Sequence, residues 1–423
     1  MKLKIFIITF LFILLVGVYT FAEGEILDSN IPDSWYEAPK TASEMGINKF
    51  DQSPTLDTAV EEGELPPVEE RLPEDPPVIE PYEKVGEYGG VINVWSTSLG
   101  LGNDAEFAGN MPAIAGRPAP DGTKTLPYFL KDWEFSDDYT EITIYLRKGI
   151  KFSDGTPLTA DDYLYWWEHE ANNEDLEPVP PEDWKPAALL DVEKIDNHTV
   201  KYSYEKPYPK IDDFEFKYNM GPGVSGEIVS ANYMKQFHPN FVEEQKIVEM
   251  AKDVDLDNWD EYYSRIRDDS PEHPEYERQR PVLRPYIAVE RSETRLVLER
   301  NPYYPFVDTE GNQLPYVDEI VVNLANDDEM ARTKAVTGEA TFASRFLMPE
   351  NIPLYKQNEE KENYSTLLYR RAYGSDIPIQ LNLTHKNDNL REIFQNKKFR
   401  QALSIAIDRE NINNKIYFGE AEP

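Results

Sequence analysis

The sequence predicts an α/β protein built from more than one domain, and three observations support this class. Apolar and polar side chains alternate over residues 141–146, which is the pattern of a strand with one buried face. Apolar side chains recur at helical spacing over residues 160–171 directly afterwards. The chain has 423 residues, more than one hydrophobic core usually serves, so we expect two or three domains.

A turn and a helix cap join this strand to this helix. Residues 153–157 (SDGTP) have turn chemistry, and Gly155 is free to take a positive φ. Thr159 is a good N-cap, because its hydroxyl accepts hydrogen bonds from the free amides of the first turn. Asp161 and Asp162 place negative charge at the positive end of the helix dipole. The expected apolar face consists of Ala160, Leu164, Trp167 and Ala171.

Three motifs carry a family resemblance. The first is residues 146–162 (LRKGIKFSDGTPLTADD), the second joins residues 301–304 (NPYY) to residues 311–324, and the third is residues 399–412. In this order they closely resemble the peptide-type (family 5) solute-binding proteins of ABC importers. The resemblance covers residues 88–423 and implies the two-lobe α/β architecture of type II periplasmic binding proteins, the Venus-flytrap fold. Those proteins are not enzymes, so no catalytic residue is expected.

Composition argues against several other functions. The formal net charge of −36, from 79 acidic and 43 basic residues, repels phosphate backbones and argues against nucleic-acid binding. Cysteine is absent, which excludes disulfides, thiolate metal sites and a lipid-modified cysteine. The five histidines show no metal-ligand spacing. We therefore expect no metal, no cofactor and no lipoprotein anchor.

The N-terminus predicts export from the cytoplasm. Residues 1–22 combine two lysines, an apolar stretch and small residues ahead of a cleavage site after Ala22, as a signal peptide does. An uncleaved anchor over residues 5–22 is the alternative, because this stretch just reaches spanning length. Both interpretations place the bulk of the chain in the periplasm or outside the cell.

Residues 23–86 form an acidic, proline-rich extension. The segment holds 17 acidic against 4 basic residues and nine prolines, so it buries too little apolar area to offset its ordering entropy. We expect it to be disordered, as a tether, or to wrap as an arm on the folded part, where Trp35, Tyr36 and Phe50 could dock. Many members of the resembled family have little chain before their first strand.

Residues 87–325 are expected to form the first lobe with an inserted subdomain. The period of the apolar residues indicates short strands, a hairpin around Asn197-His198 and a longer helical region. The expected elements are a strand at 91–95, a hairpin within 190–208, mostly helical structure over 232–263, and strands over 286–290, 294–299 and 319–324.

Residues 326–423 are expected to form part of the second lobe. The resemblance places a hinge near residues 325–328, ahead of a short helix at 331–338. Thr341 stands where the family motif usually carries aspartate. The resembled proteins continue well past the third motif, so the expectation is a C-terminally truncated chain with an incomplete second lobe.

Two helices are expected at the C-terminal end. Asp408 can cap the second of them, whose Ile412 and Ile416 are expected to pack inward and which stops near Gly419. The first has one apolar face, formed by Phe399, Ala402, Leu403 and Ala406.

Candidate ligand-binding residues lie at the end of the opening strand. In open α/β architectures ligands meet the chain beyond the carboxyl ends of strands, which selects Trp95, Ser96 and Thr97. Core packing of Trp95 is an equally good alternative. Tyr373 and Asn382 are further candidates. The family implies an oligopeptide ligand, the 12% aromatic content would also suit an oligosaccharide, and the expected partners of this monomer are the membrane subunits of an ABC transporter.

Other patterns are weaker. Residues 221–226 match the GxGxxG fingerprint of nucleotide sites, but the proline within it removes an amide donor. Asp253, Asp255 and Asp257 have the spacing of a calcium loop without its glycine and glutamate, so a solvated acidic turn is expected. Two alternatives stay open: a secreted glycoside hydrolase, which needs only two carboxylates in a cleft, and a nonfunctional or partner-dependent fragment.

Overall fold

The chain separates into two compact units. The larger unit joins residues 31–365 to residues 407–419, and the smaller is formed by the chain between them, from residue 366 to residue 406. The predicted signal peptide and Tyr373 lie outside the residues that this computed structural model describes. Those residues are 31–100, 104–111, 113–177, 188–217, 219–221, 228–268, 280–368 and 379–419. None of the helices in these ranges combines the length and apolar character that a membrane span requires.

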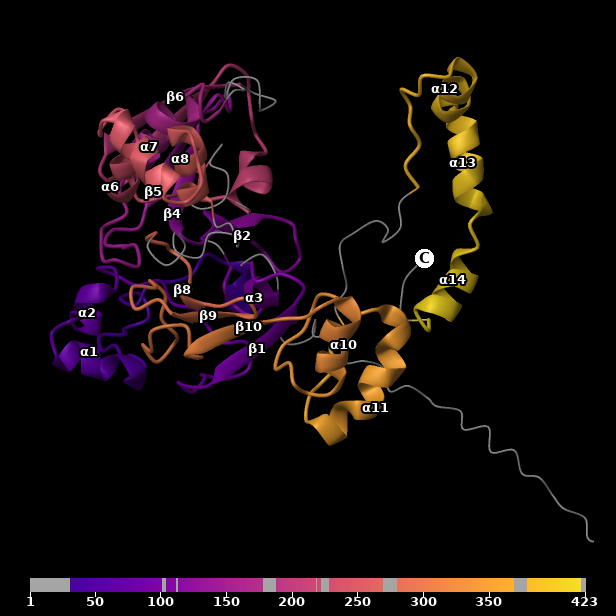
Figure 1. Cartoon of the computed structure of the whole chain (residues 1–423), viewed down its shortest axis with the longest axis horizontal. Coiled ribbons are helices and arrows are strands. Elements are labelled where there is room, and N and C mark those ends of the chain that lie inside the picture. The colour runs from indigo at the N-terminus through magenta and orange to yellow at the C-terminus, as the bar shows by residue number, and fades with distance from the viewer. Residues whose placement is uncertain are drawn as a thin grey trace, which may run out of the picture. The chain divides into compact units, whose positions relative to one another are not determined.

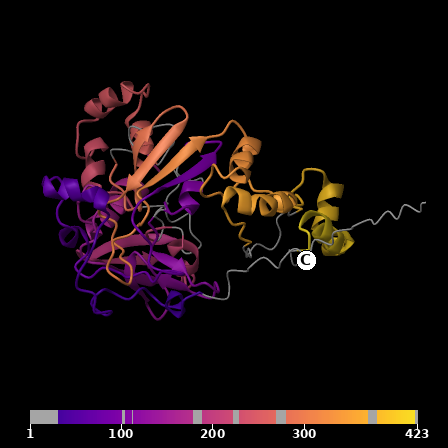
Figure 2. The ribbon, with the colours of Figure 1, turned by 90° about the horizontal axis from the view of Figure 1, so that it is seen from below.

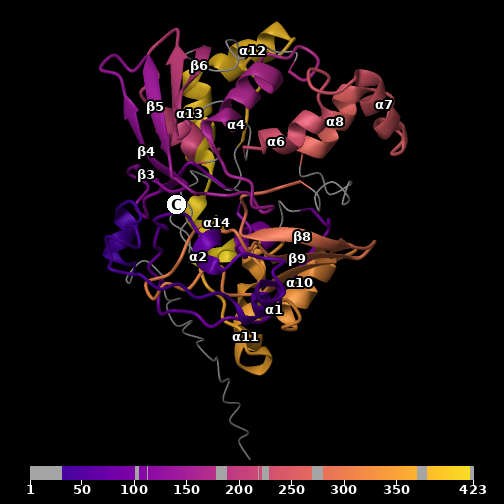
Figure 3. The same cartoon turned by 90° about the vertical axis from the view of Figure 1, so that its left-hand side faces the viewer.

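Two four-stranded sheets form the framework of the larger unit (Figure 3). One, the β5 sheet, has the order β4-β5-β7-β6 and is antiparallel, with β4 (Leu130–Phe135), β5 (Glu141–Leu146), β6 (Leu189–Asp196) and β7 (Thr199–Tyr204). The other, the β10 sheet, has the order β1-β10-β9-β8, with β1 (Val91–Ser96), β8 (Tyr286–Arg291), β9 (Arg295–Arg300) and β10 (Glu319–Leu324). A small hairpin consists of β2 (Gly116–Pro118) and β3 (Thr125–Pro127).

The predicted strand and capped helix at residues 141–171 are confirmed. Ile142 and Ile144 of β5 are buried, while Thr143 between them is not. The helix α4 (Ala160–Tyr165) begins with a capping box, in which the Thr159 N–H donates to Asp162 Oδ2 at 2.8 Å. The helix continues as a π-helical turn from Trp166 to Ala171. The buried face differs from the expected one, since the side chains in the core are Ala160, Tyr163, Trp166 and Ala171, with Leu164 and Trp167 only partly buried.

A helical subdomain lies beside α4 (Figure 3). It contains α6 (Ala231–Met234), α7 (Glu244–Lys252) and α8 (Trp259–Arg267), which confirms the helical region expected here. The subdomain has its own core, to which α7 contributes Ile247 and α8 contributes Tyr263, both essentially fully buried.

Residues 31–86 pack on the folded body, so of the two possibilities expected from the sequence the wrapped arm is found and the disordered tether is not. The segment contains α1 (Asp57–Glu61) and α2 (Val68–Arg71). The Arg71 side chain is fully buried and donates hydrogen bonds to the carbonyl oxygens of Pro66, at 3.0 Å, and Pro302. The acidic, proline-rich composition does not reveal this packing, because Arg71 holds the segment through hydrogen bonds to backbone carbonyl oxygens and not through apolar area. We call residues 31–86 the N-terminal arm.

Helices flank the β10 sheet. Val94 and Ile320 belong to a buried cluster with Ala105 of α3 (Asp104–Phe107). Figure 2 shows β1, in purple, beside the orange strands of the same sheet. The chain that leaves β10 forms α10 (Asp328–Val336), which contacts β1, and then α11 (Ile352–Glu362) (Figure 1).

The three C-terminal helices expose their apolar faces within the part of the chain that the structure describes. They are α12 (Asp388–Gln395) and α13 (Lys397–Ala406) of the smaller unit and α14 (Arg409–Ile416) of the larger unit. Asp408 caps α14 as predicted, accepting a hydrogen bond from Asn411 N at 3.0 Å. The inward packing expected of Ile412 and Ile416 is wrong, because these side chains are 43% and 45% exposed. An apolar helical period identifies a face and does not show what covers it.

Candidate ligand-binding site

The pairing of β1 with β10 sets the position of the candidate site. The two strands are parallel, with Trp95 opposite Asn323 and Ser96 opposite Leu324. Their carboxyl ends therefore meet at one edge of the sheet, which is where open α/β sheets receive their ligands. β10 leads into α10 at the same edge, through residues 325–327.

The predicted residues Ser96 and Thr97 differ in their exposure to solvent. Ser96 is 1% exposed, its carbonyl oxygen accepts from Ala325 N at 2.7 Å, and its Oγ accepts from Ser98 N at 3.3 Å. The first of these bonds ties β1 to the start of the chain segment that follows β10. Thr97 is exposed at the end of the strand. Of the two, Thr97 is the side chain that a solute can reach.

Trp95 is partly buried and lies under a lysine. The Lys334 ammonium nitrogen of α10 is 4.8 Å from the centroid of the indole ring, a distance at which cation and ring attract. Lys334 also donates to Glu339 Oε2 at 2.6 Å, and this hydrogen bond lowers the pKa of Glu339. The indole Nε1 is buried and makes no hydrogen bond within the described residues. A buried donor without a partner is costly, so this N–H is the one group of Trp95 that a ligand acceptor would stabilise.

Thr341 forms hydrogen bonds with the backbone at the outer edge of β1. Its backbone N–H donates to the carbonyl oxygen of Asn93 at 2.9 Å, and its hydroxyl donates to the same oxygen at 3.2 Å while accepting from Asn93 N. The aspartate that the resembled family usually carries here would be ionised and could not donate. Asn323 Nδ2 of β10 donates to Asn93 Oδ1 at 3.4 Å, which links β10 to the edge strand β1.

Asp104 joins α3 to the segment between α10 and α11. Its Oδ1 accepts from Ser344 N at 3.1 Å, from Ser344 Oγ at 2.6 Å and from Arg345 N at 2.8 Å. Sequence reasoning missed Asp104, Lys334 and the role of Thr341. No local pattern reveals them, since each acts on a partner more than two hundred residues away.

The remaining candidates are Asn382 and Tyr373. Asn382 belongs to the smaller unit, where its Oδ1 accepts from the backbone N–H and the hydroxyl of Thr384, both at 3.0 Å. This arrangement is a local turn ahead of α12. Tyr373 lies outside the described residues, so the site as built here comprises Trp95 and Thr97 with Lys334 above the indole ring.

Comparison with known proteins identifies a family model. The model described as bacterial extracellular solute-binding proteins, family 5 Middle, matches residues 124–423. This range contains the first, second and third motifs and extends from β3 to the C-terminal helices.

Individual relatives are binding proteins. The chain is 31% identical to the periplasmic oligopeptide-binding protein of Escherichia coli K12 over 72% of this chain and 47% of the relative. It is 28% identical to the periplasmic alpha-galactoside-binding protein of Rhizobium meliloti 1021 over 85% of this chain and 52% of the relative. The chain thus spans about half the length of the curated relatives it matches.

Solved structures agree on the fold. A solved oligopeptide-binding protein superposes with a TM-score of 0.74 at 33% identity, covering 90% of this chain and 59% of that one. A periplasmic binding protein of Agrobacterium fabrum C58 in complex with stachyose gives a TM-score of 0.61 at 23% identity, covering 93% of this chain and 58% of that one. Both neighbours support the two-lobe α/β class predicted from the sequence.

Proposed function

Because the chain belongs to the bacterial extracellular solute-binding proteins of family 5, we propose that it captures a small solute outside the cytoplasm and delivers it to an ABC importer. The observation that carries this proposal is the family match over residues 124–423, supported by the 31% identity to an oligopeptide-binding protein. Such a protein works as a monomer with the membrane subunits of the transporter as partners. Residues 87–325 form its first lobe and residues 326–423 contribute to the second.

An oligopeptide is the first candidate ligand. The relatives with 31–33% identity that cover most of this chain carry oligopeptide binding in their names. An oligosaccharide is the second candidate, because the alpha-galactoside-binding relative matches 85% of this chain. Both ligands present carbonyl or hydroxyl oxygens, which can accept a hydrogen bond from the unpartnered Trp95 indole N–H.

The mechanism we propose is a shift from an open to a closed conformation. The chain passes from β10 to α10 through residues 325–328, the hinge expected from the sequence, and α10 carries the Lys334 that covers Trp95. A movement of α10 against β1 would uncover the indole. The ligand then favours the closed state because only that state contacts it from both lobes.

A ligand screen on the purified full chain tests this function. Thermal unfolding is followed with tri- to pentapeptides and with galactosides such as stachyose, since a ligand at a hundred times its Kd stabilises the native state by about 2.7 kcal/mol. The proposal expects one class to raise the Tm and to show one site per chain by calorimetry. Chromatography of the sugar samples must show no products, because turnover would favour a glycoside hydrolase.

A defined result would contradict the proposed solute binding. If neither class binds and the chain elutes as an aggregate without a sharp unfolding transition, the partner-dependent fragment is the better account. The exposed apolar faces of α13 and α14 make this outcome a serious alternative.

A further inference from the structure

Two histidine rings meet where the helical subdomain contacts the π-helical turn that continues α4. His169 belongs to that turn, and His238 follows the 3₁₀ turn Lys235–Phe237 after α6. The ring centroids are 5.4 Å apart. His238 is fully buried, and the His169 side chain is 20% exposed. π-Helical turns within helices occur frequently at functional sites, but neither the family match nor the named relatives assign a role to this pair.

The hydrogen bonds of His238 fix the neutral form of its ring. Nδ1 accepts from the backbone N–H of Asn240 at 3.2 Å. Nε2 lies 3.1 Å from the carbonyl oxygen of His169, and because a carbonyl oxygen only accepts, Nε2 carries the proton. The side-chain amide of Asn173 lies 3.2 Å from the same nitrogen. A second proton would have to enter at Nδ1, where it would face a backbone N–H that cannot turn away.

The ring of His169 accommodates a proton more easily. Its Nδ1 lies 3.2 Å from the side-chain amide of Asn240, which can rotate to present its oxygen. Its Nε2 lies 3.8 Å from Glu168 Oε2, which attracts an imidazolium. Once His169 is charged, a proton on His238 would place two positive rings 5.4 Å apart, and these repel each other.

A lysine adds positive charge at the same place. The Lys235 ammonium nitrogen is 5.5 Å from the centroid of the Phe241 ring, and the centroid of that ring is 4.8 Å from the centroid of the His169 ring. Burial lowers the pKa of His169, and the charge of Lys235 lowers it further, while Glu168 and Glu170 act in the opposite direction. The surroundings of the pair therefore favour neutral rings.

The buried carboxylate of the same turn already has a counter-charge. Glu170 Oε2 accepts from Arg267 Nε at 2.9 Å, and Glu170 Oε1 accepts from the Tyr263 hydroxyl at 2.5 Å. Burial lowers the pKa of His238, and the charge of His169 lowers it further. The charge of Glu170 raises this pKa too little to reverse the shift.

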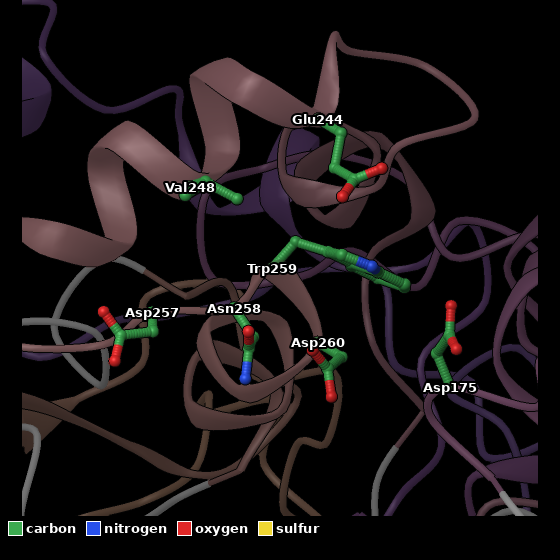
Figure 4. Close-up of a pocket in the computed structure, with 7 residues that line it drawn as sticks. All are labelled: Asp175, Glu244, Val248, Asp257, Asn258, Trp259 and Asp260. Carbon is green, nitrogen blue, oxygen red and sulfur yellow. The ribbon is translucent and has the colours of Figure 1, made fainter.

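Two aromatic rings of α8 pack on His238. The centroids of Trp259 and Tyr263 are 5.2 and 5.6 Å from that of the imidazole. Figure 4 shows the Trp259 ring between the carboxylates of Glu244 and Asp260, which line a hollow at the surface of the subdomain. A charge placed on His238 therefore acts directly on the core that holds α8.

We propose that His169 and His238 form an acid-sensitive lock between the π-helical turn and the helical subdomain. With neutral rings the lock is closed, and protonation of both rings breaks the bond from Asn240 and loosens α8 from the turn. Because the pKa of each ring in the folded protein lies below its ordinary value of 6.5, the neutral form favours folding. The stabilising contribution is complete above pH 6.5 and is lost as the pH falls through the pKa of the folded state. The lock does not depend on the proposed import function.

Imidazole NMR and amide hydrogen exchange on the full chain test the lock. The chain has five histidines, so single His→Gln variants assign the resonances. We expect His238 to stay neutral below pH 6.5, and we expect its protonation to coincide with an about tenfold rise in the opening constant of the α8 amides, corrected for intrinsic exchange. Protonation of His238 while α8 keeps its protection would overturn the lock.

The His169→Gln variant separates the lock from a purely structural role. It removes the neighbouring charge and keeps the backbone carbonyl that His238 binds, so His238 should protonate at higher pH and α8 should open less in acid. The matched control is His198→Gln, in the turn between β6 and β7, which should leave both quantities unchanged. An unchanged titration of His238 in His169→Gln would show that the rings do not interact and would overturn the lock.

The His238→Gln variant removes the titrating group itself. Glutamine offers one donor and one acceptor, as the neutral ring does, so the protection of α8 should no longer change with pH. A folded variant that keeps the pH response would contradict the lock, and if this variant does not fold, His169→Gln decides. Asp162, which accepts from Ala231 N at the start of α6, titrates in the opposite direction, and comparing variants at each pH cancels its contribution.

Discussion

A single carboxylate oxygen of Asp104 accepts hydrogen bonds from both the backbone N–H and the hydroxyl of Ser344, at 3.1 and 2.6 Å. The two residues are 240 positions apart, and Asp104 is 1% exposed. The contact holds the segment after α10 against α3, which packs on the β10 sheet. The contact therefore connects α3, which precedes the proposed hinge in the chain, to a segment that follows the hinge.

Removing this carboxylate should destabilise the protein. Asp104→Ala takes the acceptor from three donors, and we expect the free energy of unfolding in urea to fall by about 1–3 kcal/mol. Ser344→Ala removes one of the three and should cost less. Glu106→Ala, a carboxylate of the same helix that makes no side-chain hydrogen bond within the described residues, is the control. An Asp104→Ala variant as stable as the control would show that the contact contributes nothing.

Trp95→Phe should separate stability from ligand binding. The variant deletes a buried N–H that has no partner in the described structure, so the free energy of unfolding should not fall by more than the loss of packing, within about 1 kcal/mol. If the ligand accepts from that N–H, its Kd should rise about tenfold, as one hydrogen bond predicts. Unfolding in urea and calorimetry with the best ligand of the screen measure the two quantities. An unchanged Kd would remove Trp95 from the site.

The carboxyl group of Asp162 should give the stability a pH dependence. Burial raises its pKa from 3.8 to about 6, although it accepts hydrogen bonds from Thr159 N and Ala231 N. Since the folded pKa lies above the unfolded value, the protonated form favours folding. Its contribution is complete below pH 4 and is lost as the pH rises through 6.

The matched measurement uses Asp162→Asn, which does not titrate. Relative to this variant, the free energy of unfolding of the natural chain should decrease by about 2 kcal/mol between pH 4 and pH 7. Asp161→Asn changes a neighbouring exposed carboxylate that pairs with Lys194 at 2.7 Å, and it serves as the control. A flat difference over this range would mean that Asp162 titrates normally.

Arg71 should hold the N-terminal arm in place. Its buried guanidinium donates to Pro66 O and Pro302 O, so Arg71→Met leaves both carbonyl oxygens without this donor. We expect a loss of about 2–3 kcal/mol and rapid cleavage of residues 31–86 by a protease. Lys84→Met, at an exposed lysine of the same arm, should keep the natural cleavage rate. Equal cleavage rates would place the anchor elsewhere.

Local patterns predicted the elements well and their partners poorly. The alternation at Ile142 and Ile144 and the cap at Thr159 fixed a strand and a helix, because period and capping are properties of neighbouring residues. The burial of Ile412 was wrong, since an apolar face does not identify what covers it. The sequence could not decide whether the N-terminal arm is ordered, because this depends on Arg71 reaching a carbonyl oxygen 231 residues away.

The residues of the candidate site also fall into those that local patterns predict and those that they do not. Trp95 and Thr97 were predictable, because the end of a strand can be located from its own residues. Lys334 and Asp104 were not, because each contributes through a contact with a distant part of the chain.

The parallel contact between β1 and β10 also bears on how the protein acquires its structure. Asn93 and Asn323 meet across 230 residues, so the first strand emerges from the ribosome long before its neighbour exists. Pairing over such a separation costs loop-closure entropy in advance and is slow. The nascent chain must therefore keep an unpaired strand edge from associating with other molecules until most of its length has been made, which is a task suited to a chaperone.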